Sequence, residues 1–355
     1  MTRIEHIETI PFRLPLHEPL RWGAASVLED VTHVLVRVVL NDGSEGWGEA
    51  PPRPTIYGET VHSITGVVAQ EFAPRLLGEM LDEATLPILY NRLTQIKNNH
   101  TARGALDMAL HHALARSRGR SLTEHLGVVQ NQVRVSYILG LGDPEASLEE
   151  AQRVVDQGVR VLKVKVGRAW GEDMHRLRLL REHFGDQVAL YADANETFTP
   201  QNARRRLEQL AELNVLYCEE PLPVELVLAR AALRKANVLP LIADDSAFGW
   251  RDLRRELSLD TFHILNIKTA RTGFTESTRM LQQALVAGKG VMVGSQASAG
   301  WGTVQAALFS GKQGIDHPCE LSFFLKLGAD LLDRPLLIQD GCLDLASANT
   351  ARIDP

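Results

Sequence analysis

From residue 131 onward, short apolar stretches alternate with stretches of helical periodicity. The apolar stretches lie at 133–139, 160–166, 188–195, 215–221, 240–246, 263–268, 290–296 and 317–321. The segments between them, such as 146–158, 200–214 and 275–288, are amphipathic and long enough for a helical crossover. A βα unit that recurs about every 25 to 30 residues predicts eight parallel strands closed into a barrel rather than an open sheet.

The first 130 residues follow a different pattern. Strand-like runs at 3–16, 32–40 and 45–50 precede a long helical segment at 102–119. This order predicts an α+β domain with a small antiparallel sheet. His111 and His112 lie on the helical segment without a third spaced ligand, so we expect them to pack rather than bind metal. The tail, 322–355, has a hairpin-like pattern around Asp340 and Gly341 and is expected to pack on this first domain.

Composition narrows the function to small-molecule chemistry. The 355 residues carry a net charge of −6 and no basic block, which argues against nucleic acid or an anionic membrane surface as partner. No run of 18 apolar residues and no signal-like N-terminus occurs. Cys218, Cys319 and Cys342 form no paired motif. We therefore expect a soluble, unexported, cytoplasmic protein with reduced thiols.

Charged and polar side chains stand where the predicted strands end. They are Lys163, Lys165, Asp193, Asn195, Glu219, Glu220, Asp244, Asp245 and Lys268. Lys163 and Lys165 share one strand face, which alone is also typical of a solvated strand. Because five consecutive strands carry such groups, and because buried charges persist only when paired or bound to metal, we expect a site at the carboxyl end of the barrel.

Three of these carboxylates are candidate metal ligands. Asp193, Glu219 and Asp244 come from adjacent predicted strands, and an all-oxygen set favours Mg²⁺ or Mn²⁺ over zinc. The lysines of the second and sixth strands flank them. A metal and a neighbouring cation would push each amine towards neutrality, so that a lysine could remove a proton α to a metal-bound carboxylate.

As a set, these motifs resemble the muconate-lactonizing subgroup of the enolase superfamily. The motifs are KxK at Lys163–Lys165, DxN at Asp193–Asn195, EEP at 219–221, DDS at 244–246 and a lysine at 268, with GWGEA at 46–50. The resemblance implies a modified (β/α)7β barrel (131–321) under an α+β capping domain (1–130, completed by 322–355). It implies Mg²⁺ on Asp193, Glu219 and Asp244, acid/base roles for Lys165 and Lys268, a substrate-carboxylate contact for Lys163, and a homo-oligomer.

Four positions depart from the patterns of this subgroup or vary within it. Asp245 replaces the usual glutamate, and Ser298 lies in a segment where lactonizing enzymes carry a glutamate. Glu320 is the one acidic group left of the pair that holds an ammonium in the dipeptide epimerases, and it could still bind one. Arg271 either holds a second substrate carboxylate or is a surface arginine at a helix start.

Loops 21–30 and 51–60 are expected to select the substrate, a small carboxylic acid. Trp22 and Tyr57 are either pocket walls or buried structural aromatics. We place cycloisomerisation of a muconate-like diacid first. Racemisation, epimerisation or dehydration of an amino or imino acid derivative would share its intermediate, and a barrel that binds an acid without turning it over is the alternative from another class.

Overall fold

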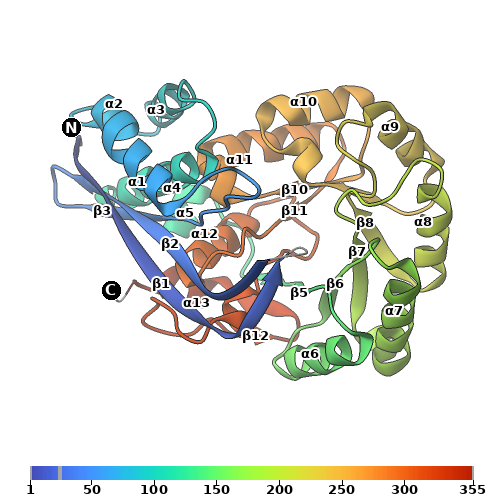
Figure 1. Ribbon diagram of the computed structural model, residues 1–355. Helices are drawn as coiled ribbons and strands as arrows, with labels where there is room; N and C mark the ends of the chain where they lie inside the picture. The colour runs from blue at the N-terminus through green and yellow to red at the C-terminus, as the bar shows by residue number, and fades with distance from the viewer. Residues whose placement is uncertain (1, 23–25, 354–355) are drawn as a thin grey trace.

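The computed structural model describes residues 2–22 and 26–353, and the side chains of residues 20–22 and 26–28 lie outside that description. An N-terminal antiparallel sheet with its helices lies beside a curled parallel sheet ringed by helices (Figure 1). This is the predicted α/β class with a separate N-terminal sheet, and the expectation is confirmed. No described helix is both long and apolar enough to cross a bilayer.

The N-terminal part is built on a sheet of order β1-β2-β3. Its strands are β1 Ile4–Trp22, β2 Ser26–Leu40 and β3 Glu45–Ala50, and its helices are α1 Val61–Val67, a π-helical turn Val68–Phe72, α2 Ala73–Leu76, α3 Leu86–Leu93, α4 His100–Ser117 and α5 Leu122–Leu126. Helix α4 packs directly on β3. A Cβ atom at Gly48 would lie 1.9 Å from the carbonyl oxygen of Ala105, so only glycine permits this approach.

The barrel sheet has the order β11-β10-β9-β8-β7-β6-β5, and all its pairings are parallel. Its strands are β5 Tyr137–Leu139, β6 Val161–Lys165, β7 Ala189–Asp193, β8 Val215–Glu219, β9 Leu241–Ala243, β10 Ile264–Ile267 and β11 Gly290–Val293. The surrounding helices are α6 Pro144–Asp156, α7 Trp170–Phe184, α8 Ala203–Glu212, α9 Val227–Ala236, α10 Trp250–Leu259, α11 Thr269–Val286 and α12 Gly300–Ser310, with 3₁₀ turns at Gly185–Gln187, Asp245–Ala247 and Phe323–Lys326.

Closure of the barrel differs from the prediction. The expected eighth strand at 317–321 forms an isolated bridge instead, in which Cys319 N donates to Arg134 O and Ser136 N donates to Cys319 O, each over 2.8 Å. On its other side Glu320 N donates to Val293 O over 2.9 Å. The segment thus bridges the two edges of the sheet, just before β5 and at β11, through single hydrogen bonds rather than a ladder. Leu321 N donates back to Cys319 O over 3.0 Å, so the chain turns directly after Glu320.

The predicted first strand is also divided in two. Its beginning, β4 Gln132–Arg134, pairs with the tail hairpin of β12 Ile338–Gln339 and β13 Cys342–Asp344, and only β5 joins the barrel. The tail hairpin therefore packs on the start of the barrel rather than on the N-terminal sheet. Helix α13 Leu345–Thr350 follows, and Asn349 Oδ1 accepts a bond of 3.4 Å from Thr123 N of α5.

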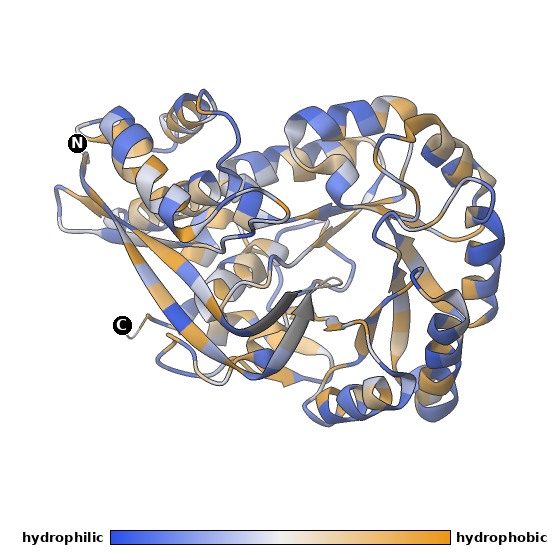
Figure 2. Ribbon diagram, in the orientation of Figure 1, coloured by the Kyte–Doolittle hydropathy of each residue, from blue (hydrophilic) through white to orange (hydrophobic). Residues whose placement is uncertain are grey.

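The barrel interior divides into an apolar floor and a charged top. The floor is a buried cluster from the starts and middles of the strands, namely Val161, Tyr191, Tyr217, Ile242, Ile264 and Met292. Hydrophobic colours run along the barrel strands, whereas the outer faces of helices such as α7 and α8 are hydrophilic (Figure 2). Burial of the floor and of the helix faces fixes the strands, so their carboxyl ends can hold charges in place.

Candidate active site

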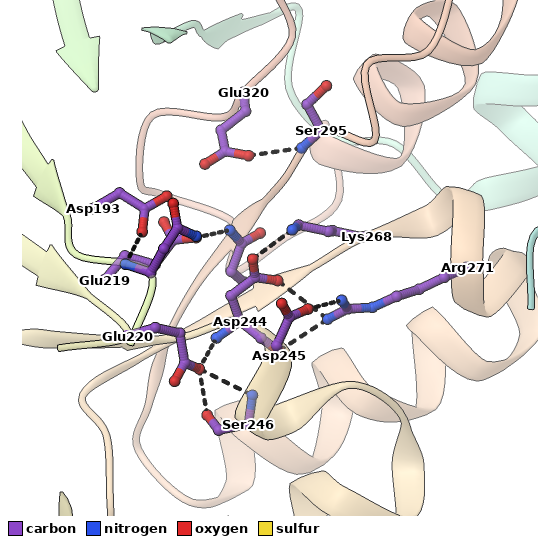
Figure 3. A network of polar contacts seen from close by, with 12 residues as sticks. Asp193, Glu219, Glu220, Asp244, Asp245, Ser246, Lys268, Arg271, Ser295 and Glu320 are labelled. Atoms are coloured by element: carbon purple, nitrogen blue, oxygen red, sulfur yellow. Dashed lines mark hydrogen bonds and ion pairs between the residues drawn. The ribbon is translucent and has the colours of Figure 1, made fainter. Parts of the chain in front are cut away.

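A cavity of about 320 Å³ opens at the carboxyl ends of the barrel strands. Most of the residues singled out in the sequence line it: Lys163, Lys165, Asp193, Asn195, Asp244, Asp245, Lys268 and Glu320. Glu219 is fully buried directly beside Lys163. The strand-end pattern therefore brings these groups together, as expected from parallel strands that end on one face (Figure 3).

Lys163 lies at the centre of a group of buried carboxylates. Its Nζ is 2.9 Å from Asp193 Oδ2 and 2.8 Å from Glu219 Oε2, and it also donates to Glu320 Oε1. Burial alone would lower the pKa of Lys163, but the three carboxylates outweigh it and raise that pKa well above the ordinary value. The ammonium of Lys163 thus supplies the positive charge that these carboxylates require in this arrangement.

Lys165 and Lys268 approach the cavity from opposite sides. Lys165 ends β6 and Lys268 follows β10, with β7, β8 and β9 between them in the sheet. Lys165 Nζ donates to Asp193 Oδ2 over 2.6 Å, and Lys268 Nζ donates to Asp244 Oδ2. Burial alone would lower the pKa of Lys268, but the carboxylates of Asp244 and Asp245 outweigh burial and raise that pKa above its ordinary value.

The donor set fits a divalent cation. Asp193, Glu219 and Asp244 are 4% exposed or less. Asp244 Oδ1 accepts no hydrogen bond from any described residue, and Arg271 Nη2 lies 3.3 Å from it as an ion pair. Burial raises the pKa of Glu219, and the neighbouring Asp193 raises it further although Lys163 opposes this, so the carboxylates repel one another. The ammonium group of Lys163 lies between the carboxylates of Asp193 and Glu219. Within residues 2–22 and 26–353, no three Asp, Glu, His or Cys side chains are arranged as a metal-binding cluster.

Glu220 and Arg271 hold Asp244 from behind. Glu220 Oε1 accepts hydrogen bonds from Asp244 N, Ser246 N and Ser246 Oγ. Arg271 donates to Asp244 O over 2.9 Å and to Asp245 Oδ1 over 3.0 Å, and its guanidinium lies 4.3 Å from the centre of the Phe248 ring. Arg271 is 1% exposed, so the surface alternative is wrong. It is absent from the described cavity wall, where its neighbour Asp245 lies.

Two other predicted positions, Ser298 and Tyr57, are absent from the described cavity wall. Ser298 is buried and lies against Gly302. The Tyr57 ring packs edge-on against Phe248 at 5.3 Å, which agrees with the structural alternative rather than with a pocket wall. Trp22 ends β1, but its side chain lies outside the described part of the chain.

Several residues of the cavity wall escaped sequence reasoning. They are Ile138, Gly140, Leu141, Val166, Arg168, Ala194, Thr197, Ser295, Ala297, Phe323 and Lys326, whereas Ile56 lies in the loop 51–60 that was expected to select the substrate. Most follow strands in loops without periodicity. Only Arg168 had a usable signal, since it stands three residues after Lys165 at a strand end.

Glu49 of the GWGEA motif fixes the loop after β11. Its carboxylate accepts hydrogen bonds of 2.7 Å from Ala299 N and from Gly302 N, at the start of α12. A carboxylate at a helix N-terminus satisfies backbone donors that the helix leaves free. The N-terminal sheet thus positions Gln296 and Ala297 at the cavity wall.

Comparison with known proteins places this architecture in a family. Residues 6–127 match the mandelate racemase / muconate lactonizing enzyme N-terminal domain, and residues 146–349 match the enolase C-terminal domain-like family. The muconate lactonizing enzyme from Mucobacterium Smegmatis, solved with muconolactone, is 39% identical with a TM-score of 0.93 and covers 99% of this chain and 97% of its own.

Curated relatives include amino-acid epimerases and racemases. The L-Ala-D/L-Glu epimerase of Bacillus subtilis is 29% identical over 87% of this chain and 85% of its own length. The N-succinylamino acid racemase of Thermus thermophilus is 29% identical over 96% of this chain and 92% of its own length. Since these relatives are enzymes, the non-catalytic alternative is set aside. The chain is an enzyme of the mandelate racemase / muconate lactonizing enzyme family, within the enolase superfamily.

Proposed function

We propose that the protein moves a proton at the carbon α to a substrate carboxylate, with Asp193, Glu219 and Asp244 as the residues that hold Mg²⁺. A cation bound there would supply Lewis acidity that stabilises negative charge on the substrate carboxylate. The observation that carries the proposal is the pair of lysines, Lys165 and Lys268, on opposite sides of one cavity above these carboxylates.

Among the reactions of this chemistry, cycloisomerisation of a muconate-like diacid fits the cavity best. One carboxylate oxygen would add to the carbon β to the other carboxylate, and the α carbon would take a proton from a lysine, which solvent then replaces. Glu320 supports this choice because Lys163 already balances its charge and Ser295 N donates to its other oxygen, so it attracts a substrate ammonium group less strongly than an unpaired carboxylate would. Similarity to the enzyme solved with muconolactone points the same way.

The test is conversion of cis,cis-muconate, followed by loss of the diene absorbance. We expect turnover with Mg²⁺, loss of turnover with a chelator and recovery when Mg²⁺ is restored. Absence of turnover with Mg²⁺ present would contradict the cycloisomerase assignment.

Racemisation of an N-acylated amino acid is the second candidate. The observation in its favour is that each lysine faces its own side of the cavity, as inversion at one carbon requires. An acylated substrate carries no ammonium group, so the engaged Glu320 does not exclude it. Incubation of N-succinylamino acids in D₂O would show exchange of the α-proton if this activity is present, and no exchange if it is absent.

A further inference from the structure

The cations that line the cavity differ in what holds them. Four lysines, namely Lys163, Lys165, Lys268 and Lys326, are each paired with a carboxylate. Lys326 Nζ, for instance, lies 2.6 Å from Glu150 Oε1 and 4.4 Å from the centre of the Tyr137 ring. Arg168 also lines the cavity and is exposed, but it makes no hydrogen bond or ion pair with any residue in the described part of the chain.

The backbone that carries Arg168 is firmly braced. Gly167 N donates to Asp173 Oδ2 over 2.6 Å, and Arg176, itself 2% exposed, donates to Gly140 O over 2.9 Å and to Lys165 O. Gly167 has φ 110°, and a Cβ atom there would lie 1.7 Å from Thr197 Oγ1. The chain therefore passes close against the loop after β7, and the guanidinium is carried by a fixed loop.

An apolar wall stands in the same cavity as the carboxylate cluster and Arg168. It consists of Ile56, Ile138, Leu141, Val166 and Phe323. Such a wall suits a hydrocarbon chain, and a guanidinium suits a carboxylate that it can bind through two parallel bonds. The cavity of about 320 Å³ is at the small end of ligand sites, which favours a short diacid.

We propose that Arg168 binds the second carboxylate of a dicarboxylate substrate and so selects diacids over monoacids. This proposal rests on the proposed function, in which the first carboxylate lies at the Asp193, Glu219 and Asp244 end of the cavity. Arg168 is then a specificity-determining residue, and the paired Lys326 is not required for this contact.

The experiment compares binding of two unreactive acids of equal length, adipate and hexanoate, by calorimetry with Mg²⁺ present. Wild-type protein is expected to bind adipate more tightly than hexanoate. In Arg168→Met the affinity for adipate should fall about 10- to 100-fold, the range for a lost charge-assisted hydrogen bond, while that for hexanoate stays within about twofold. Arg168→Lys should recover part of the loss.

Arg178→Met is the matched control, because Arg178 is an exposed arginine on α7 outside the cavity wall, and its removal changes the net charge equally. It should leave both affinities unchanged. Equal loss for both acids in Arg168→Met, an equal loss in Arg178→Met, or no preference for adipate in the wild type would overturn the proposal.

Turnover separates this proposal from the proposed function. If adipate binding depends on Arg168 but muconate is not converted, the diacid subsite stands and the cycloisomerase assignment fails. If muconate is converted and Arg168→Met leaves its KM unchanged, the subsite fails and the reaction stands. When both hold, Arg168→Met should raise KM for muconate more than it lowers kcat.

Discussion

At the scale of single residues, the carboxylates at the strand ends are the groups whose removal has the clearest consequence. We expect Mg²⁺ affinity to fall at least about tenfold in each of Asp193→Asn, Glu219→Gln and Asp244→Asn. Even mutation of residues that only hydrogen-bond to metal ligands typically lowers metal affinity by that factor, and loss of a ligand charge should do no less. The fold should persist because the apolar floor is untouched. Calorimetric titration with Mg²⁺, alongside circular dichroism, measures both.

Asp245→Asn is the control for these variants. Asp245 stands next to Asp244 and carries the same charge, but its Oδ1 already accepts a bond from Arg271. It should retain most of the Mg²⁺ affinity. Unchanged affinity in all three ligand variants would remove the basis for the metal assignment.

Single residues also show what the sequence could and could not predict. Lys163, Asp193 and Asp244 were predictable, because alternation within a strand and a regular repeat fix both the face and the end of each strand. Arg271 was not. Its burial behind Asp244 depends on the kinked start of α11, where Gly273 has φ 63°, and no periodicity encodes that path.

At the scale of elements, the contact between α4 and α11 links the N-terminal part to the barrel. A Cβ atom at Gly104 would lie 2.4 Å from Ala270 O. Gly104→Ala should therefore destabilise the protein by about 1–3 kcal/mol, as overpacking does, and should lower activity because Ala270 follows Lys268 by two residues. Urea unfolding and kcat measure the two effects.

The control is Gly66→Ala on α1, where a new Cβ atom meets nothing within 4 Å. Alanine is the better helix former, so this variant should be neutral or more stable by up to about 1 kcal/mol. A Gly104→Ala protein as stable as Gly66→Ala would mean that the two helices can separate at little cost.

A chain of hydrogen bonds crosses the same contact and makes stability depend on pH. His111 is bonded to His125 and to Thr275 Oγ1, each over 2.9 Å, and Thr275 Oγ1 donates to Asp107 Oδ1. This agrees with the expectation that His111 serves packing. Burial lowers the pKa of His111 to about 3 and that of His125 to about 4.

Because the folded-state pKa of His111 lies below the unfolded value, its contribution to stability is complete above about pH 6.5 and is lost as the pH falls from there towards 3. Asp107 has the opposite effect. Burial raises the pKa of Asp107 to about 7, so the contribution of Asp107 to stability is lost as the pH rises towards 7.

Replacing His111 removes one of these groups. In His111→Asn, the unfolding free energy should therefore fall less steeply below pH 6.5, by up to about 1.4 kcal/mol per pH unit. The control is His62→Asn, because His62 is exposed, and this variant should keep the wild-type slope of unfolding free energy against pH. Equal slopes in the wild type, His111→Asn and His62→Asn would contradict the prediction.

Elements differ in how far sequence patterns determine them. Strands β6, β7, β8, β10 and β11 lie within the predicted ranges because apolar runs between amphipathic helices have few alternatives. The segment 317–321 was predicted as a strand, but among the described residues it makes a single isolated bridge, between Cys319 and Val135. Its state depends on where the chain leaves the barrel, and that is set by tertiary contacts such as the bond from Glu320 N to Val293 O.

At the scale of the whole molecule, the assembly of copies stays a prediction. Large apolar side chains are exposed on several helices, including Ile88 on α3 at 54% and Leu228 on α9 at 78%. Exposed apolar residues of this kind are typical of subunit contacts when they form patches. We expect a homo-oligomer by light scattering at micromolar concentration, and a monomer under those conditions would contradict the expectation.

The central claim, that a lysine in a diacid-binding cavity delivers a proton to the carbon α to a carboxylate, is tested most directly by turnover of cis,cis-muconate in D₂O with Mg²⁺. NMR of the lactone should show one deuterium, in a single configuration, at the carbon α to the free carboxylate. Lys165→Ala and Lys268→Ala should affect its formation very unequally, since only one lysine faces the side that is protonated. Full activity in both variants, or deuterium in both configurations, would contradict the account.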